Sequence, residues 1–224
     1  MFVGHYGPSF AGKALDEDNR IPLWLLFIAV QFVDVLWAVF VLLGIEKVRI
    51  IPSLPSSPLD LYYMPYTHSL VGALGWSLFA FLLCQLLPGL RGPRSGWIVG
   101  AAVFSHWILD LIVHRPDLTL YDSVFKMGFG VWNYPIPAFL LEMLVLFGGA
   151  WLYAKSAGRK GKAKLWSFVA VLAVLQFVGI FFFPPPPSGR NEAVTALFFY
   201  LLLALIAAWV ERGQGKTTVQ AAYH

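Results

Sequence analysis

Long apolar runs are the feature of this sequence that most restricts its fold. A helix needs about 20 apolar residues to cross a bilayer. Six runs reach roughly that length, at residues 21–44, 69–90, 96–114, 133–154, 165–183 and 193–210. In lipid the backbone must hydrogen-bond within the protein, so spanning segments are helices or barrel strands. The sequence shows no alternating pattern of the kind that barrel strands carry, and the runs therefore predict helices.

The composition agrees with this interpretation, since 58% of the 224 residues are hydrophobic and only 12% are charged. A soluble domain is about half apolar and about a quarter charged. We therefore expect an all-α fold, an integral membrane helical bundle of about six transmembrane helices. Residues 1–224 are expected to form a single polytopic membrane domain, in which 116–211 supply supporting helices and 212–224 form a tail.

The N-terminal segment predicts a further, shorter helix. Residues 3–15 are mildly apolar and lead to the polar stretch "DEDNR" at 16–20, which is typical of a turn at the membrane surface. A helix that folds back on the first span would be an N-terminal half-membrane helix. At about 1.5 Å per residue it would carry His5 about 15 Å into the bilayer. An amphipathic arm lying on the surface is the alternative.

Lys and Arg are unevenly distributed between the loops. The N-terminal segment, the 88–95 and 155–164 loops and the tail carry most of them. Because cytoplasmic loops are enriched in Lys and Arg, this bias predicts a cytoplasmic C-terminus. The net charge of +4 fits such loops better than a nucleic-acid surface, so no nucleic-acid partner is expected. The single cysteine, Cys84, excludes an internal disulfide and a Cys-rich metal site.

Ionisable side chains interrupt three of the apolar runs. His106, Asp110 and His114 are four residues apart and so lie along one stripe of a helix. At about 1.5 Å per residue, Asp34 lies about 15 Å and Glu142 about 12 Å inside their spans. A charged side chain at the centre of a bilayer costs about 2.5–3.5 kcal/mol. Such residues turn inward, where they pair with one another or form a site.

A metal ion is one partner that suits carboxylates and neutral imidazoles together. Zn²⁺ binds His nitrogen and Asp oxygen at about 2.0–2.2 Å, and His-x3-Asp places two such ligands on one helix face. If one position stays open, the metal lowers the pKa of its bound water to about 7. His106 and Asp110 are therefore the strongest candidates for metal binding or catalysis, with a hydrogen-bonded pair that joins helices as the alternative.

Four short motifs resemble one family. "SHWILD" at 105–110 is similar to the Ser-His-x-x-Leu-Asp motif of the membrane-bound, metal-dependent hydrolases of bacterial inner membranes, the YdjM-like group. "YTHS" at 66–69 resembles that family's Thr-His-Ser segment, and "FVDV" at 32–35 its acidic motif. "GHYG" at 4–7 resembles its N-terminal helix with an early His. The resemblance covers about residues 1–115, which are thus expected to carry the site.

The resemblance implies a hydrolase of the bacterial inner (plasma) membrane that is distantly related to zinc-dependent phospholipases. Its implied metal, zinc, would be held by His5, Asp34, His68, His106 and Asp110. Because apolar walls surround the site, we expect a membrane lipid or another amphiphilic ester, amide or phosphoester as substrate. The expected catalytic groups are Glu142 and Asp110, one of which takes a proton from the metal-activated water.

Residues near the outer helix ends are candidates for substrate contacts. Arg115 would hold a phosphate or carboxylate, although a positive charge that ends the helix explains it equally well. Tyr63 and Tyr66 would line the same surface, where aromatic residues are common in any membrane protein. His114 is expected to lie at the interface or to support the ligands.

Two other functions fit the same residues. Buried Asp, Glu and His side chains also form proton or ion relays in transporters and channels, but the sequence shows no internal repeat and few signs of broken central helices. A non-catalytic membrane scaffold would use the polar groups for helix packing alone. The sequence leaves the oligomeric state open.

Overall fold

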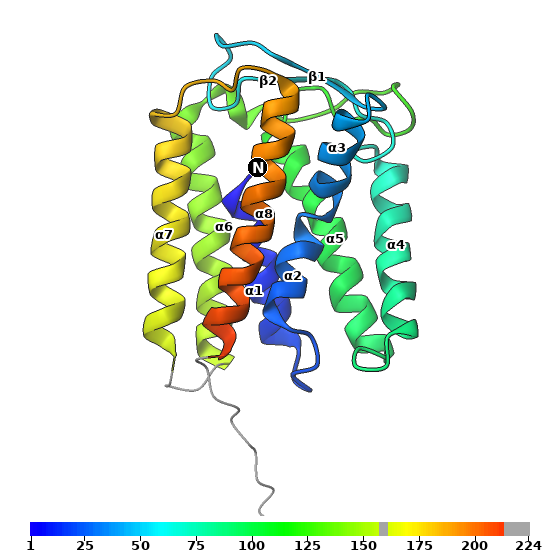
Figure 1. Cartoon of the computed structure of the whole chain (residues 1–224), viewed down its shortest axis with the longest axis vertical. Helices are drawn as coiled ribbons and strands as arrows, with labels where there is room; N and C mark the ends of the chain where they lie inside the picture. Colours follow the sequence, from blue (N-terminus) through cyan, green and yellow to red (C-terminus); the bar gives the residue numbers. More distant parts are fainter. Residues whose placement is uncertain (157–160, 213–224) are drawn as a thin grey trace, which may run out of the picture.

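The computed structural model describes residues 1–156 and 161–212. Helices dominate this part of the chain (Figure 1). The elements in chain order are η1 (Val3–His5), α1 (Tyr6–Leu15), α2 (Leu23–Val30), α3 (Phe32–Leu42), β1 (Lys47–Ile50), β2 (Leu59–Tyr63), α4 (Leu70–Leu86), α5 (Pro93–Val113), η2 (Val131–Asn133), α6 (Pro135–Ser156), α7 (Lys162–Phe181) and α8 (Gly189–Arg212).

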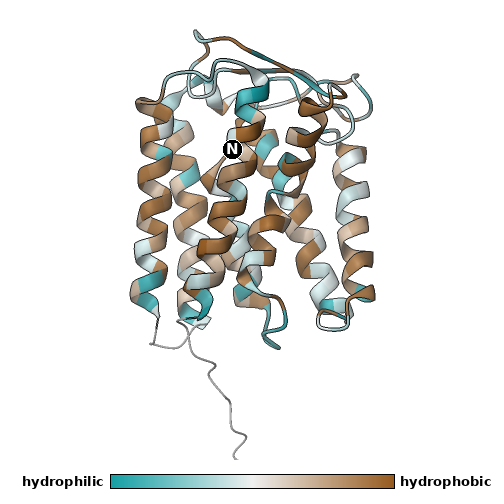
Figure 2. Ribbon diagram, viewed as in Figure 1, coloured by the Kyte–Doolittle hydropathy of each residue, from teal (hydrophilic) through white to brown (hydrophobic). Residues whose placement is uncertain are grey.

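The helices fall on the six predicted apolar runs, but in the described part of the chain four of them, or five with a bent pair, are long and apolar enough to span a membrane, where the sequence predicted about six. Among the described residues, the four helices α5 to α8 are each long and apolar enough to cross a membrane. The pair α2 and α3 passes the same test as one span bent by 54°, and α4 is an apolar helix of 17 residues. Figure 2 shows hydrophobic residues along most of the length of these helices. The all-α multi-pass fold is therefore confirmed.

The connections gather at two ends of the bundle. The α1–α2 turn, the α4–α5 loop and the end of α8 lie at the lower end in Figure 1, whereas the strands and the α7–α8 connection lie at the upper end. The prediction from the Lys and Arg distribution placed the same connections together on one side of the membrane. Most of the predicted tail, residues 213–224, and part of the 155–164 loop lie outside the described residues, and a cytoplasmic C-terminus stays a prediction.

A short antiparallel hairpin corrects the expectation that strands are absent. Strands β1 and β2 pair with Lys47 opposite Tyr63 and Ile50 opposite Leu59. They are four and five residues long and lie beyond the helix ends, so the hydropathy of the spans gives no sign of them. The hairpin covers the upper end of the bundle.

The predicted half-membrane helix is present. Helix α1 lies inside the bundle rather than on its surface, and it packs against α6 and α2 (Figure 1). Two glycines allow the close approach to α6: a Cβ on Gly7 would collide with the Val145 carbonyl, and one on Gly149 with the Gly7 carbonyl. This contact holds η1, and with it His5, in the middle of the bundle.

A buried lysine fixes the lower end of the half-membrane helix. The Lys13 ammonium donates to Asp16 Oδ2 (3.3 Å), Asn19 Oδ1 (2.6 Å) and the Ile21 carbonyl (2.6 Å), and it lies 2.9 Å from Glu211 Oε1 at the end of α8. We call Lys13, Asp16, Asn19 and Glu211 the Lys13 cluster. The predicted turn at "DEDNR" is thus tied to the last helix.

The first span is broken at Gln31, where the sequence predicted one continuous segment. Gln31 ends α2 and begins the bend into α3, and its side-chain amide donates to the Phe2 carbonyl (3.2 Å). A break frees backbone carbonyls that a continuous helix would use. Here the Val30 carbonyl accepts from the imidazole of His106 (2.7 Å), so the break supplies a polar partner inside the bundle.

Candidate metal centre

Six ionisable side chains meet in the interior of the bundle. They come from η1, from α3, from the turn before α4 and from α5, segments that are far apart in the sequence. We call this set the His–Asp cluster; it consists of His5, Asp34, His68, His106, Asp110 and His114. The structure brings together all five residues predicted as metal ligands, and it adds His114, which the sequence suggested only for a supporting role.

Asp110 lies at the centre of the cluster because of the four-residue spacing on α5. Its Oδ2 is 3.0 Å from His106 Nε2 on one side and 3.3 Å from His114 Nε2 on the other. His68 Nε2 approaches the same oxygen at 3.8 Å. His106 and Asp110 are 0% and 1% exposed, respectively. The stripe that the sequence predicted is therefore fully buried and faces its partners.

Four distances between His68, His106 and the two carboxylates lie near the spacing of ligand atoms in a tetrahedral zinc site. Bonds of about 2.0–2.2 Å place the ligand atoms of such a site about 3.3–3.6 Å apart. Asp34 Oδ1 lies 3.2 Å from His68 Nε2 and 3.4 Å from His106 Nε2. Asp110 Oδ2 completes the set, at 3.8 Å from His68 Nε2 and 3.0 Å from His106 Nε2. Among the described residues, two groups of three have ligand atoms that all lie within 4.8 Å of one another: Asp34, His68 and His106 form one, and His5, His106 and Asp110 form the other.

The contacts of Nδ1 in three imidazoles indicate which ring nitrogen carries the proton. His106 Nδ1 contacts the Val30 carbonyl, which can only accept, so Nδ1 carries the proton. His114 Nδ1 likewise lies 2.9 Å from the Asp117 carboxylate. His68 Nδ1 lies 2.8 Å from Thr67 Oγ1, whose own proton goes to Glu46 Oε2 (2.6 Å). Each neutral ring therefore presents an Nε2 lone pair to the cluster, as metal-binding histidines do.

An imidazole nitrogen lone pair and a carboxylate oxygen that face each other repel, because both are acceptors. His106 Nε2 is within ion-pair distance of two carboxylates, yet it makes no hydrogen bond with either. The distances are short enough for hydrogen bonds, but the angles are not suitable, and a short contact with poor geometry is not a hydrogen bond. A buried polar atom without a partner is costly. Either a cation between these atoms or a second proton on the imidazoles would remove the conflict.

Glu46 supports His68 from outside the spans. This nearly fully buried carboxylate accepts from the Tyr66 and Thr67 backbone N–H groups, both at 2.9 Å, as well as from the Thr67 hydroxyl. Burial raises the pKa of the Glu46 carboxyl group, although His68 and these hydrogen bonds oppose the shift. The sequence reasoning missed Glu46, whose only sign was an acidic residue directly after an apolar span.

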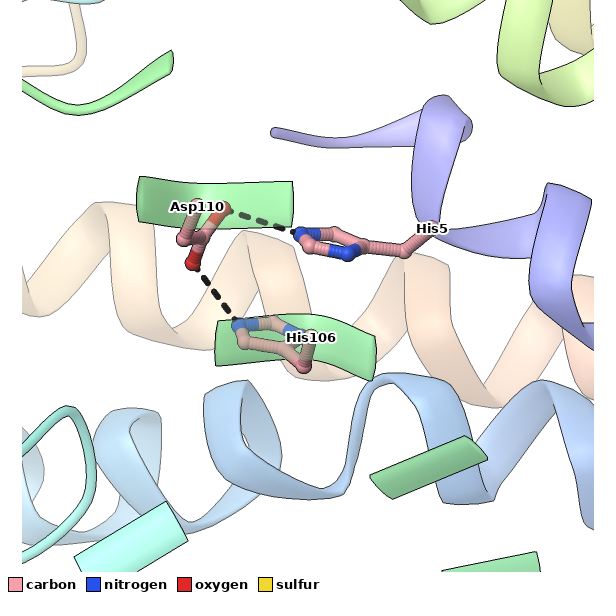
Figure 3. A group of neighbouring side chains, drawn as sticks. All are labelled: His5, His106 and Asp110. Atoms are coloured by element: carbon pink, nitrogen blue, oxygen red, sulfur yellow. Dashed lines mark hydrogen bonds and ion pairs between the residues drawn. The ribbon is translucent and has the colours of Figure 1, made fainter. Parts of the chain in front are cut away.

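His5 contacts the cluster in a different way. Figure 3 shows its ring beside that of His106, with Asp110 linked to both. The two rings are stacked 3.9 Å apart at 7°, and His5 Nε2 lies 3.1 Å from Asp110 Oδ1, which also accepts from the Met1 amino group (2.7 Å). Lone pairs lie in the plane of an imidazole, so parallel rings do not converge on one ion. The geometry favours His5 as a support for Asp110; its role as a ligand stays a prediction.

Glu142, predicted as a proton acceptor, holds the N-terminal segment. One oxygen accepts from the Phe2 and Gly4 backbone N–H groups, both at 3.0 Å, and the other from Gln176 Nε2 at 2.8 Å. Its carboxylate is buried in α6, on the wall of the cavity described next. A catalytic role for Glu142 stays a prediction.

A cavity of about 850 Å³ leads away from the cluster. Binding sites for small molecules have about this size. Asp34, His68, Asp110 and His114 form its inner end, and residues of α7, α8 and the 52–59 loop form its walls.

The three residues predicted to contact substrate are not among those that line this cavity in the described part of the chain. Tyr66 instead lines a second hollow beside Phe40 and Trp76. Arg115 donates to Asn133 Oδ1 (3.0 Å) and to the Pro55 carbonyl (2.7 Å), so it joins two loops. Tyr63 lies in the β hairpin, opposite Lys47. Substrate contacts by these side chains stay predictions without a supporting contact.

The sequence reasoning also missed partners from the last two helices. Tyr200 of α8 donates its hydroxyl to Asp34 Oδ2 at 2.7 Å, and Gln176 of α7 bonds Glu142. Both are isolated polar residues in apolar runs, which is the signal that could have identified them. The sequence analysis assigned these helices only a supporting role.

Comparisons with known proteins give no relative. A scan against protein-family models, a search of curated proteins and a search of solved structures each returned no match. The candidate site therefore rests on its own geometry.

Proposed function

We propose that this protein is a metal-dependent hydrolase of the bacterial inner membrane, with zinc as its metal and an amphiphilic ester, amide or phosphoester as its substrate. The observation that carries the proposal is the convergence of imidazole Nε2 lone pairs and carboxylate oxygens at the spacing of a zinc site. Divalent cations relieve such a conflict directly.

The proposed ligands are Asp34, His68, His106 and Asp110. A zinc ion held by these residues would supply Lewis acidity and would make water a good nucleophile near neutral pH. The chain orients these ligands from behind: Val30 holds His106, Thr67 and Glu46 hold His68, and Tyr200 holds the outer oxygen of Asp34.

The remaining polar groups fit supporting tasks. His114 Nε2, next to Asp110 Oδ2, is positioned to join the ligands or to hold a proton. Glu142, on the wall of the cavity, is the proposed proton acceptor. Apolar walls around the cavity favour a substrate that enters from lipid.

A proton relay is the second candidate, favoured by the same unpaired nitrogen. If the imidazoles carry a second proton, each becomes a cation opposite a carboxylate, and the conflict disappears without metal. Buried His and Asp chains serve this purpose in membrane transporters. The break in the first span is a feature that transporters also use.

Metal content separates the two candidates. We would purify the protein in mild detergent without chelator and measure metal by elemental mass spectrometry, beside a His106→Ala, Asp110→Ala double variant. Gln176→Ala is the matched control, because it removes a buried polar side chain that touches Glu142 and not the ligands. We expect about one zinc per chain in wild type and control and almost none in the double variant, since four-coordinate sites fail without two ligands. A wild-type protein without stoichiometric metal would contradict the proposal and favour the relay.

A further inference from the structure

The cavity continues from the His–Asp cluster into the space between α7 and α8. Helix α7 packs chiefly on α6, and α8 on α2 and α3, so these two helices contact each other little. Figure 1 shows them standing apart, with α6 behind. Leu175 and Ile180 from α7 and Ala196 and Phe199 from α8 line the cavity there.

One glycine shows that this space is open. Gly179 lines the cavity, and a Cβ built on it would meet no atom within 4 Å. The lining of the cavity therefore has room for a side chain at this position. The space between α7 and α8 has apolar walls, which suit one hydrocarbon chain better than a polar molecule.

The charges along the cavity restrict the polar part of a ligand. Four carboxylates line it, from Asp34, Asp110, Glu142 and Glu192, and one ammonium, that of Met1, which is paired with Asp110 at 2.7 Å. The lining in the described part of the chain includes no Lys or Arg. Anionic head groups are usually held by Arg or Lys. A divalent ion at the cluster would itself be shared among two of these carboxylates. The cavity is therefore unfavourable for an anionic head.

Aromatic side chains suit a cationic head instead. Trp37, Trp132 and Tyr200 line the cavity, and the ring of Trp132 packs against His114 with the ring centroids 4.2 Å apart. The faces of Trp and Tyr attract ammonium groups, quaternary ones included. Together with the surrounding carboxylates, they complement a positive or uncharged polar group.

We propose that this cavity binds an amphiphile with its single acyl chain between α7 and α8 and with a cationic or uncharged polar group near the His–Asp cluster. Cleavage of such a molecule rests on the proposed hydrolase function, whereas its binding does not.

Equilibrium binding of three radiolabelled probes tests this proposal. The probes share one oleoyl chain and differ in head charge: oleoylcholine is cationic, 1-oleoylglycerol is uncharged and 1-oleoyl-lysophosphatidate is anionic. We expect the first two to bind and the third to bind at least about tenfold more weakly, because like charges placed together at a desolvated site oppose binding strongly. Equal or tighter binding of the anionic probe would overturn the assignment of the head group.

A cavity-filling variant tests where the chain lies. Gly179→Leu should weaken oleoylcholine binding by about tenfold, because each methylene that it displaces costs about fourfold in affinity. Gly148→Leu is the matched control: a Cβ there also meets nothing within 4 Å, but Gly148 lies on α6 and does not line the cavity. Equal affinities of the two variants would overturn the placement between α7 and α8.

The outcomes separate this inference from the proposed function. Probe binding by a protein that holds no metal would refute the hydrolase proposal and leave the amphiphile site standing. If the protein holds zinc but binds all three probes equally, or if Gly179→Leu does not change binding, the amphiphile site is refuted and the hydrolase proposal stands.

Discussion

The two buried polar clusters of this protein differ in how their donors and acceptors are matched. In the Lys13 cluster, one ammonium faces a ring of oxygen acceptors, and every contact joins a donor to an acceptor. In the His–Asp cluster, three imidazoles use Nδ1 to contact partners outside the cluster, and their Nε2 atoms face carboxylates. The donors and acceptors of the first cluster are matched by the chain's own atoms, whereas those of the second would be matched by a bound cation or by further protons on the imidazoles.

This difference indicates how a structural cluster can be distinguished from a site. Buried polar groups are almost always satisfied, so a complete network needs no explanation beyond stability. A group of acceptors that face one another is unexplained unless a cation or additional protons bind between them. The comparison therefore predicts that changes in the Lys13 cluster affect stability and that changes in the His–Asp cluster affect metal binding.

Lys13→Met should have the largest effect and should act on stability alone. Removal of one partner from a buried ion pair costs about 3–5 kcal/mol, since Asp16 would be left buried without a counter-charge. We expect a clear fall in the melting temperature in detergent, with the zinc content per folded chain unchanged. Lys162→Met, at the half-exposed start of α7, is the matched control and should melt like wild type. Loss of zinc in folded Lys13→Met protein would remove the distinction between the clusters.

Glu46→Gln should weaken zinc binding by about 10–100-fold, the usual effect of a lost outer partner. Without a carboxylate to accept its proton, the Thr67 hydroxyl can donate to His68 Nδ1, which moves the imidazole proton to Nε2 and removes a ligand. Zinc affinity from competition with a chelator, together with nitrogen NMR of the His68 tautomer, would measure both steps.

The control for this prediction is Glu17→Gln, an exposed carboxylate paired with Arg94 at 2.7 Å. We expect it to leave zinc affinity unchanged. If the two variants bind zinc equally tightly, Glu46 does not position His68.

Tyr200→Phe should have the smallest effect, a loss of less than about tenfold in zinc affinity, because water can replace a lost hydroxyl where there is room. The hydroxyl holds Asp34 Oδ2, whereas Oδ1 is the oxygen that faces the histidines, and Asp34 lines the cavity. Tyr153→Phe, a nearly buried tyrosine of α6 outside the cluster, should have no effect on zinc. An effect of Tyr200→Phe larger than that of Glu46→Gln would contradict the assigned ligand oxygens.

The spans and the polar stripe of α5 were predictable because both follow from local rules, whereas His5, Asp34 and His68 were expected as ligands from the family resemblance. Hydropathy marks apolar runs, and four-residue spacing places His106, Asp110 and His114 on one face. Even the half-membrane helix follows from the length of residues 3–15 and the polar turn after them.

The rest depends on contacts between distant segments. Nothing local shows that the first span breaks at Gln31, that Glu46 reaches Thr67, or that Tyr200 faces Asp34. His114 was expected at the interface or in support of the ligands, and its side chain reaches Asp110 as that of His68 does. The cavity between α7 and α8 is likewise a property of packing.

The glycine contact between α1 and α6 has a consequence for biogenesis. Gly7 is synthesised about 140 residues before Gly149, yet the two helices pack so closely that a Cβ at either position would collide with the backbone of the other helix. Early segments generally fold first during synthesis. Here α1 can reach its final position only after α6 is inserted. His5 is therefore synthesised early but reaches its position in the His–Asp cluster late.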